Sequence, residues 1–320
     1  MLLSRIVTAV LTINLVPFGA GVAFGQDYPS KPIRLIMGPA GGGADFTARL
    51  IGPGMSSALG QPVIVDNRSS GFVPMEAVAK APSDGYTLLI NGGSTWINPL
   101  LQKTPYDPVS DFAPVTVVTR EVLVLAVHPS MPVKSVKELV ALAKAKPGEL
   151  NYASGSIGGP PHLGVELLKS MAGVNIVNVP YKGSAAGITA LISGEVQLTI
   201  YDAGLLMPHV KAGKLRAVAV TSAEPSALTP GIRTIAGSGL PGYELVGRTG
   251  VWAPAKTSVA IVSRLNQEIV RVLAVQEVKD KFLTAGAETV GGTPEQFAAT
   301  IKTEMDKWRK VIREAGIKPI

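Results

Sequence analysis

Short apolar runs alternate with longer amphipathic segments along most of this chain. The runs are rich in β-branched residues and are bounded by glycine, proline or polar residues, which is typical of buried strands. Segments with helical spacing of apolar residues follow most of them. This alternation favours an α/β fold with largely parallel sheets. The expected strands lie at residues 33–37, 62–66, 86–90, 122–127, 150–153, 176–179, 196–201, 215–220 and 243–252.

Two of the expected helices have clear N-terminal signals. Ser135 stands three residues before Glu138, which predicts a capping box. Thr293 stands before Pro294 and Gln296, which predicts another. Apolar residues then repeat on one face of the C-terminal helix, so we expect it to pack on a sheet that is already formed. That face carries Phe297, Ile301, Met305, Trp308 and Ile312.

The first strand leads through a glycine loop into a helix. Gly38 follows the strand, glycines occupy positions 41–43, and Asp45 begins the next amphipathic run. Backbone N–H groups and the helix dipole attract anions at such a point, and glycine leaves the approach open. A phosphate-binding loop needs Lys and then Ser or Thr after its last glycine, whereas Ala44 follows here. The loop therefore favours a carboxylate, and an ordinary tight turn is the alternative.

Two further loops are expected at the same edge of the sheet. Residues 67–72 and 91–95 follow the next two strands. Ligands of open α/β sheets bind beyond the carboxyl ends of the strands, so these loops lie where a ligand is expected. Phe72 and Trp96 are placed to line a pocket there, and the alternative is that each ring packs beneath its own loop.

The pattern divides the chain into two α/β lobes. Residues 26–127 and 249–320 are expected to form lobe 1, and residues 128–248 are expected to be inserted as lobe 2. Apolar segments near 122–127 and 247–253 carry the chain across, and two such crossings form a hinge. We therefore expect a small ligand to bind in a cleft between the lobes.

The N-terminus has the features of an export signal. Arg5 precedes an apolar stretch at residues 6–16 that is too short to span a bilayer. Ala23 and Gly25 provide the small residues that a signal peptidase requires. Residues 1–25 are therefore expected to be removed, which leaves a soluble exported protein. The chain has no Cys, so neither lipid attachment at a cysteine nor a disulfide is expected.

Composition narrows the class of partner. The formal net charge is +7, but Lys and Arg are scattered, without the basic runs and interleaved aromatics of a nucleic-acid surface. A small anion is therefore favoured over nucleic acid. The three histidines lack metal-binding spacing and no G-x-S-x-G motif occurs, so we expect no metal, cofactor or enzymatic activity. A Ser156–His162 pair, as in a secreted hydrolase, is the enzymatic alternative.

Motifs along essentially all of the mature chain match one family in type and spacing. They include YPSKPIR at 28–34, GGGAD at 41–45, DGYTLL at 84–89, LNYAS at 150–154, VPYKGS at 179–184 and GGTPE at 291–295. Together they resemble the Bug-type solute-binding receptors of tripartite tricarboxylate transporters. The resemblance implies a two-lobed periplasmic-binding-protein type II fold that closes on a small carboxylate and delivers it to an integral-membrane permease. It also implies that the glycine loop and the loop after residue 153 hold the ligand.

The protein is expected to be a monomer. A ligand-sensing subunit of a receptor kinase is an alternative to a transport receptor, because both need the same cleft.

The chain departs from the family pattern at residues 68–72, 158–162 and 201–204, and Arg248 stands where the family more often has an aromatic residue. Arg248 is expected either to pair with a ligand carboxylate or to be a solvent-facing hinge charge. The two loop aromatics favour an aromatic over an aliphatic carboxylate. The candidate ligand-binding residues are Pro39, Ala40, Gly41, Gly42, Gly43, Asp45, Ser70, Phe72, Ser94, Thr95, Trp96, Ser154, Ser156, Gly158, His162, Asp202 and Arg248.

Overall fold

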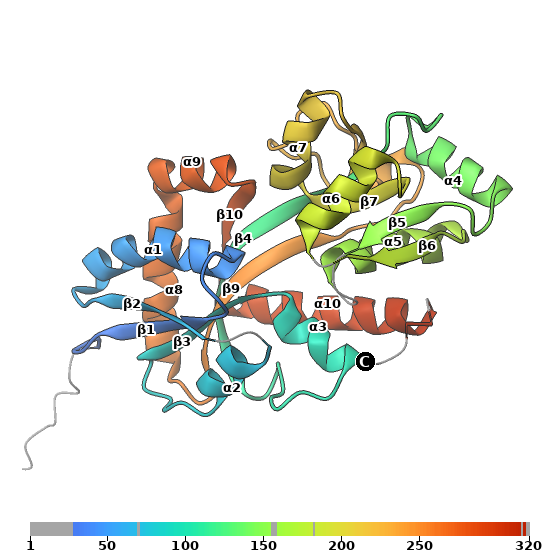
Figure 1. Ribbon diagram of the computed structural model, residues 1–320. Coiled ribbons are helices and arrows are strands. Elements are labelled where there is room, and N and C mark those ends of the chain that lie inside the picture. Colours follow the sequence, from blue (N-terminus) through green and yellow to red (C-terminus); the bar gives the residue numbers. More distant parts are fainter. Residues whose placement is uncertain (1–27, 69–70, 155–158, 182, 315, 318–320) are drawn as a thin grey trace, which may run out of the picture.

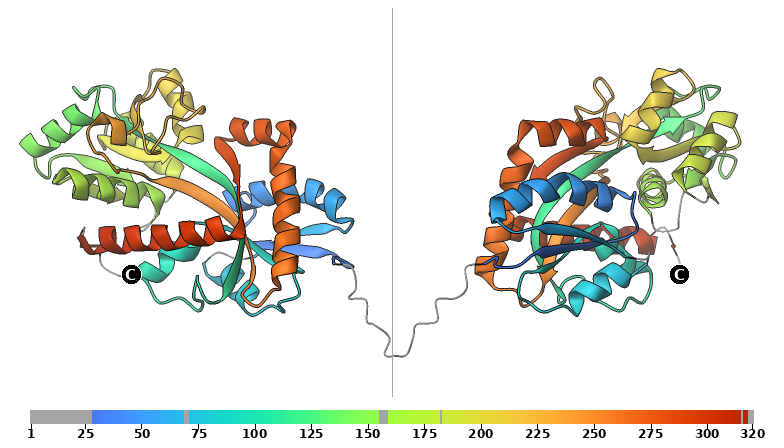
Figure 2. Two further views of the ribbon diagram at one scale, coloured as in Figure 1. Left: turned by 180° about the vertical axis from the view of Figure 1, so that it is seen from behind. Right: turned by 60° about the vertical axis from the view of Figure 1, so that its left-hand side comes forward.

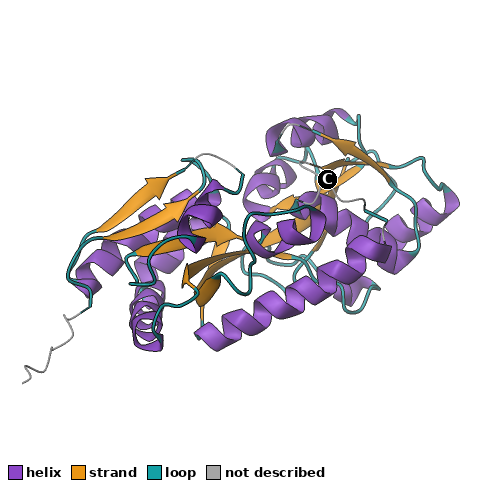
Figure 3. Cartoon of the chain, turned by 90° about the horizontal axis from the view of Figure 1, so that it is seen from below, coloured by secondary structure: helices purple, strands orange, loops and turns teal. Residues whose placement is uncertain are grey.

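The computed structural model describes residues 28–68, 71–154, 159–181, 183–314 and 316–317. The segment expected to be an export signal lies outside them. Helices and strands alternate through both halves of the molecule (Figure 3). The strands are β1 (Ile33–Met37), β2 (Val63–Asn67), β3 (Thr87–Gly92), β4 (Phe112–Val127), β5 (Asn151–Ser154), β6 (Val177–Pro180), β7 (Leu198–Asp202), β8 (Arg216–Val220), β9 (Val246–Pro254) and β10 (Ala287–Gly291).

The helices cover both faces of these strands. They are α1 (Gly43–Leu59), α2 (Val73–Ala79), α3 (Ser94–Leu101), α4 (Val136–Ala145), α5 (Pro160–Ala172), α6 (Ser184–Ser193), α7 (Ala203–Lys211), α8 (Val259–Ala274), α9 (Gln276–Thr284) and α10 (Pro294–Glu314), with a short 3-10 helix, η1 (Ala236–Ser238). Among the described residues, none of these helices combines the length and the apolar character needed to cross a membrane.

One mixed sheet of ten strands runs through the described residues, in the order β2-β1-β3-β9-β4-β7-β5-β6, with β8 and β10 also paired to β4. Strands β2, β1 and β3 are parallel in one lobe, and β7, β5 and β6 are parallel in the other. Between them, β4 and β9 pair antiparallel with each other and with their neighbours. The prediction of largely parallel sheets is therefore only partly right. The sheet is mixed because its two central strands carry the chain in opposite directions between the lobes.

Strand β4 belongs to both lobes. Its residues up to Val122 pair with β9, whereas Leu123 and the residues after it pair with β7 and β8. The strand therefore changes partners between Val122 and Leu123. The two lobes lie on either side of this crossing, with β4 and β9 running between them (Figure 1). The lobe boundaries expected at 127/128 and 248/249 stay predictions.

Helix α10 extends along both lobes (Figure 2). The predicted capping box holds its first turn, since Thr293 Oγ1 accepts from the Gln296 N–H (3.2 Å) and Gln296 Oε1 accepts from the Thr293 N–H (2.9 Å). Its apolar face, including Phe297, Ile301 and Trp308, is buried. The helix contacts α3 in lobe 1 and α5 in lobe 2. One cluster of buried side chains consequently continues from the first lobe into the second.

Strand β10 was not predicted. It pairs antiparallel with β4, from Ala287 opposite Glu121 to Gly291 opposite Val117. Its five residues contain no apolar run and lie between glycines, so neither periodicity nor composition marks a strand. The free edge of β4 in lobe 1 supplies the pairing that the local sequence does not indicate.

Candidate ligand-binding cleft

Asp45 shapes the glycine loop between β1 and α1. Its carboxylate accepts hydrogen bonds from the Gly41 N–H (2.9 Å), the Arg49 Nε (3.0 Å) and the Asn67 side-chain amide (3.0 Å). Gly41 has a φ of +84°, a left-handed conformation that glycine adopts readily. The hydrogen bonds from Arg49 and then Gly41 hold the pKa of Asp45 at about 2. Asp45 is therefore ionised at neutral pH and holds the loop in place.

Three backbone N–H groups at the start of α1 are available to a ligand. Within the described residues, the N–H groups of Gly42, Gly43 and Ala44 donate no hydrogen bond, and both glycines are exposed. The positive end of the helix dipole lies at the same point, so these groups suit an anionic oxygen. The Gly41 N–H, also expected to be free, is not, because Asp45 accepts it.

The start of α3 is a second helix N-terminus in lobe 1. Ser94 is exposed there. Thr95 is only 1% exposed, and its hydroxyl donates to the Gly92 carbonyl (3.0 Å) and accepts from the Asn91 side chain (3.0 Å). Thr95 therefore holds the turn, and Ser94 is the hydroxyl that faces solvent. The exposed candidates of lobe 1 are Pro39, Ala40, Gly41, Gly42, Gly43 and Ser94.

The two loop aromatics are packed in the protein. Trp96 is 2% exposed, with its ring centroid 5.9 Å from that of Trp252. Phe72 packs edge-on against Tyr106 at 6.0 Å and adjoins the core. Trp96 is therefore mostly packed in the core, whereas Phe72 remains partly exposed, and the role of the two rings in lining the ligand pocket stays a prediction. Ser70, the neighbouring candidate, lies outside the described residues.

Lobe 2 contributes the ends of β5 and β7. Ser154 ends β5 and is buried, and its hydroxyl donates to Asn178 Oδ1 (2.7 Å). The next candidates, Ser156 and Gly158, lie outside the described residues. Asp202 ends β7 and is partly buried at the start of α7.

His162 lies in the first turn of α5. Its ring stacks on Tyr152 with 6.5 Å between centroids and is 6% exposed. Burial lowers the pKa of His162, so the ring is neutral at neutral pH. A neutral, stacked ring in the core adds no positive charge to the cleft.

A cavity of about 280 Å³ lies between the lobes. Residues from α3 and α10 line it on one side, and residues from the start of α5 line it on the other. Of the predicted candidates, it brings together Ser94, Trp96 and Arg248. The remaining lining residues are Gly93, Ile97, Asn98, Gly159, Pro160, Leu163, Leu245, Val246, Gly247, Glu304 and Trp308.

Arg248 enters this cavity from β9. Its side chain is 17% exposed, with Nη1 3.4 Å from Glu304 Oε1 and Nη2 3.5 Å from Glu244 Oε1. Glu304 is more tightly held by Lys307 (2.6 Å) and by Trp308 Nε1 (2.9 Å). The solvent-facing alternative for Arg248 is therefore wrong. Its long contacts leave the guanidinium able to accept another carboxylate as a partner.

Comparison with known proteins identifies the family. Residues 47–317 match the description "Tripartite tricarboxylate transporter family receptor". The chain belongs to this receptor family. It is 34% identical to Protein BugT of Bordetella pertussis over 97% of both chains. The solved structure "R. palustris Rpa4515 with adipate" is 38% identical with a TM-score of 0.77, covering 92% of this chain and 100% of that one. MatC from Rhodopseudomonas palustris with bound malate is 27% identical with a TM-score of 0.72, covering 89% and 100%.

These neighbours confirm the two-lobed α/β fold of the receptor.

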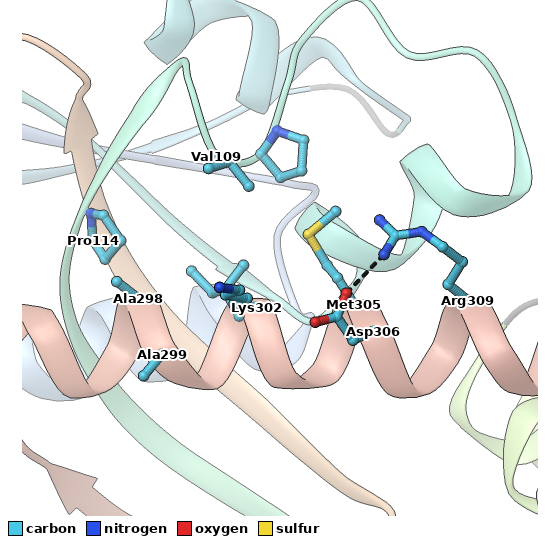
Figure 4. A pocket seen from close by; sticks show the side chains of 10 residues that line it. Val109, Pro114, Ala298, Ala299, Lys302, Met305, Asp306 and Arg309 are labelled. Carbon is cyan, nitrogen blue, oxygen red and sulfur yellow. Dashed lines mark hydrogen bonds and ion pairs between the residues drawn. The ribbon is translucent and has the colours of Figure 1, made fainter.

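A second, larger groove of about 610 Å³ lies on the outer side of α10 (Figure 4). All of its lining residues come from lobe 1, so closure of the lobes would not enclose it. At its rim, Asp306 and Arg309 pair with each other at 2.8 Å. Of these two pockets, the cavity between the lobes is therefore the better candidate for the part of the site beyond the glycine loop, which lines neither of them.

Sequence reasoning missed two residues that shape the glycine loop of the receptor. Asn67 donates to both Asp45 and the Gly38 carbonyl, and Arg49 donates to Asn67 Oδ1 (3.1 Å). Asn67 was detectable as the polar residue that ends a strand beside the first one. Arg49 had only its i,i+4 spacing from Asp45 as a signal.

In the part of the chain that the structure describes, no three His, Cys, Asp or Glu side chains are grouped so that they could hold a metal ion.

Proposed function

We propose that the receptor binds a small carboxylate between its lobes and delivers it to a membrane permease of the tripartite tricarboxylate type. The observation that carries the proposal is the row of free N–H groups at Gly42, Gly43 and Ala44, at the N-terminus of α1. They offer donors and a positive dipole without requiring a metal. The related structures whose printed names include adipate and malate support a carboxylate as the ligand.

The proposed ligand class is tested by thermal unfolding in the presence of carboxylates. The panel contains adipate and malate as aliphatic probes and benzoate and phthalate as aromatic ones. A ligand at one hundred times its dissociation constant adds about 2.7 kcal/mol to stability, which gives a clear rise in Tm. An aromatic probe that outperforms adipate would support the ligand expected from Phe72 and Trp96.

The variant Gly42→Val tests whether the ligand binds at these N–H groups. A Cβ at Gly42 has its nearest neighbour at 3.6 Å, an ordinary contact, so the fold is expected to tolerate the change. The branched side chain would stand over the free N–H groups, and the rise in Tm should disappear. Equal rises in the wild type and in Gly42→Val would contradict the placement of the ligand, and no rise with any probe would contradict the ligand class.

Binding is proposed to occur without chemistry. Mass spectrometry after prolonged incubation should find each carboxylate unchanged, and conversion of any of them would show that the receptor is an enzyme.

Delivery is measured as uptake of labelled ligand by cells that carry the permease, with and without the receptor. Export is tested by purifying the protein from the periplasmic fraction and measuring its mass. The mass should correspond to a chain that begins close to Gln26.

A further inference from the structure

A groove of about 410 Å³ in lobe 2 carries positive charge without any acid. It lies between the start of α4, strand β8 and the segment that leads into η1. Lys134 and Lys137 line it from the α4 side, and Arg233 comes from the segment before η1. None of the described residues that line the groove is acidic. Three cations therefore share one concave surface.

The charge of these three cations is not compensated by their neighbours. The side chains of Lys134, Lys137 and Arg233 form no ion pair with any described residue. In the groove on α10, by contrast, Arg309 pairs with Asp306 at 2.8 Å. Cations that gather without acids repel one another, and an anion between them would relieve that repulsion.

The acid that lies nearest to the two lysines in the sequence is used by the helix itself. Glu138 Oε2 accepts from the backbone N–H of Lys134 (2.6 Å), and the Glu138 N–H donates to Ser135 Oγ (3.2 Å). These hydrogen bonds hold the first turn of α4 in place. Glu138 is therefore committed to the helix start and does not line the groove.

A fourth cation adjoins the groove. The guanidinium of Arg216 donates to the carbonyls of Pro129 (3.1 Å), Met131 (2.9 Å) and Val133 (3.0 Å). It forms no ion pair with a described residue. Arg216 directly precedes Ala217, which lines the groove. Because carbonyls carry no net charge, the charge of Arg216 adds to the positive potential there.

Lys137 is positioned by the backbone that follows η1. A Cβ at Gly239 would lie 3.2 Å from Lys137 Cγ and 3.3 Å from its Cε, so the lysine stem lies flat against this glycine. A side chain that is already held in place loses less entropy when it binds an anion. Ser238, which also lines the groove, has a hydroxyl that forms no hydrogen bond with a described residue and can donate to the same anion.

We propose that this groove is a second anion site and that it binds a phosphate group. A phosphate monoester carries nearly two negative charges at neutral pH, so it gains more than a single carboxylate does from several cations. Lysine binds phosphate as a point charge, and arginine can donate to two of its oxygens. A free phosphate ester and a lipid headgroup present the same group to the receptor.

The groove is separate from the proposed carboxylate site. No described residue lines both this groove and the cavity between the lobes. Figure 1 shows α4 at the end of lobe 2 that is farthest from α1. All lining residues of the groove come from lobe 2, so a rotation of the lobes would leave it open to solvent. A phosphate could therefore bind whether or not the cleft is occupied.

Calorimetry with glycerol 3-phosphate at low ionic strength tests the soluble ligand. The groove variant combines Lys134→Gln, Lys137→Gln and Arg233→Gln. The control variant combines Lys103→Gln, Lys256→Gln and Lys302→Gln, three exposed cations of lobe 1 that form no ion pair with a described residue. Both variants lose the same charge. The groove variant should bind glycerol 3-phosphate at least about tenfold more weakly than wild type, whereas the control should stay within about twofold.

Cosedimentation with vesicles tests the lipid headgroup. Vesicles of phosphatidylcholine are compared with and without phosphatidic acid, whose headgroup is a phosphate monoester. Each basic side chain near an anionic lipid surface contributes about fivefold to binding, so the groove variant should bind about a hundredfold more weakly than wild type. Binding of either probe through the three groove cations supports the site, and the vesicle comparison identifies the source of the phosphate.

Four results would overturn the inference. Neither probe binds at low ionic strength, where charge interactions are least screened. The control variant loses as much binding as the groove variant, which would mean that net charge alone attracts the probes. Adipate displaces glycerol 3-phosphate, which would place the phosphate in the carboxylate site. A glutamate-rich peptide binds more tightly than both phosphate probes, which would indicate an acidic protein segment as the partner.

Discussion

Replacing Asp45 by Asn removes the charge around which the glycine loop is arranged. The carboxylate receives three hydrogen bonds, from Gly41, Arg49 and Asn67. Hydrogen bonds to a charged group are worth about 1.5–3 kcal/mol each. The Arg49 side chain is 57% exposed, so solvent screening reduces its share to below about 1 kcal/mol. Because the amide keeps one acceptor oxygen, we expect Asp45→Asn to lower the free energy of unfolding by about 2 kcal/mol.

The pH dependence of this loss has a definite sign. The pKa of Asp45 is lowered from 3.8 to about 2 in the folded protein. Its contribution to stability is therefore fully present above pH 4 and is lost as the pH falls towards 2. Urea unfolding at pH 7 should show a lower midpoint for Asp45→Asn with an unchanged slope, and the difference from wild type should shrink at pH 3.

Ligand binding distinguishes two roles for Asp45. If the residue positions the loop, Asp45→Asn should weaken carboxylate binding by about tenfold, which corresponds to 1.4 kcal/mol. If its charge merely repels the ligand, the same variant should bind more tightly. Asp306→Asn is the matched control, because Asp306 is 61% exposed and its one ion pair among the described residues is with Arg309 at the surface. It should change stability by less than about 0.5 kcal/mol. Wild-type stability or improved affinity in Asp45→Asn would refute the reasoning.

Three further variants test other parts of the cleft. Gly41→Ala places a Cβ at a φ of +84° and should cost about 1 kcal/mol in chemical unfolding, whereas Gly42→Val should unfold like wild type. Arg248→Leu should weaken carboxylate binding at least tenfold in calorimetry, and unchanged affinity would limit the role of the guanidinium to its ion pairs. Glu304→Gln should lower the free energy of unfolding by about 2 kcal/mol, because Glu304 is 6% exposed and accepts hydrogen bonds from charged donors and from Trp308. A loss below about 0.5 kcal/mol would contradict the importance of these hydrogen bonds on α10.

The elements that the sequence predicts well are those marked by local signals. The strand at residues 33–37 and the helix start at Thr293 were placed to the residue or nearly so, since an apolar run and a capping box are local. The first half of β4 was missed, because Phe112–Glu121 mixes Pro, Thr and Arg with its apolar residues. Such a segment becomes a strand only because β9 and β10 lie beside it.

The candidate site was predictable only where the backbone provides it. The glycine loop follows from a strand, glycines and a helix, all of which are consecutive in sequence. The pairing of Arg248 with Glu304 depends on a contact between residues far apart in the chain. Nothing in the local sequence of β9 indicates which acid Arg248 contacts, so this feature required the structure.

The shared core along α10 gives the receptor a built-in optical reporter. All three tryptophans of the chain belong to one buried cluster: Trp96 and Trp308 line the cavity between the lobes, and Trp252 contacts Trp96 and Phe297. Any rotation of one lobe against the other alters the surroundings of these indoles together. The emission of unlabelled receptor should therefore change as cargo is captured, so that occupancy can be followed without attaching a dye.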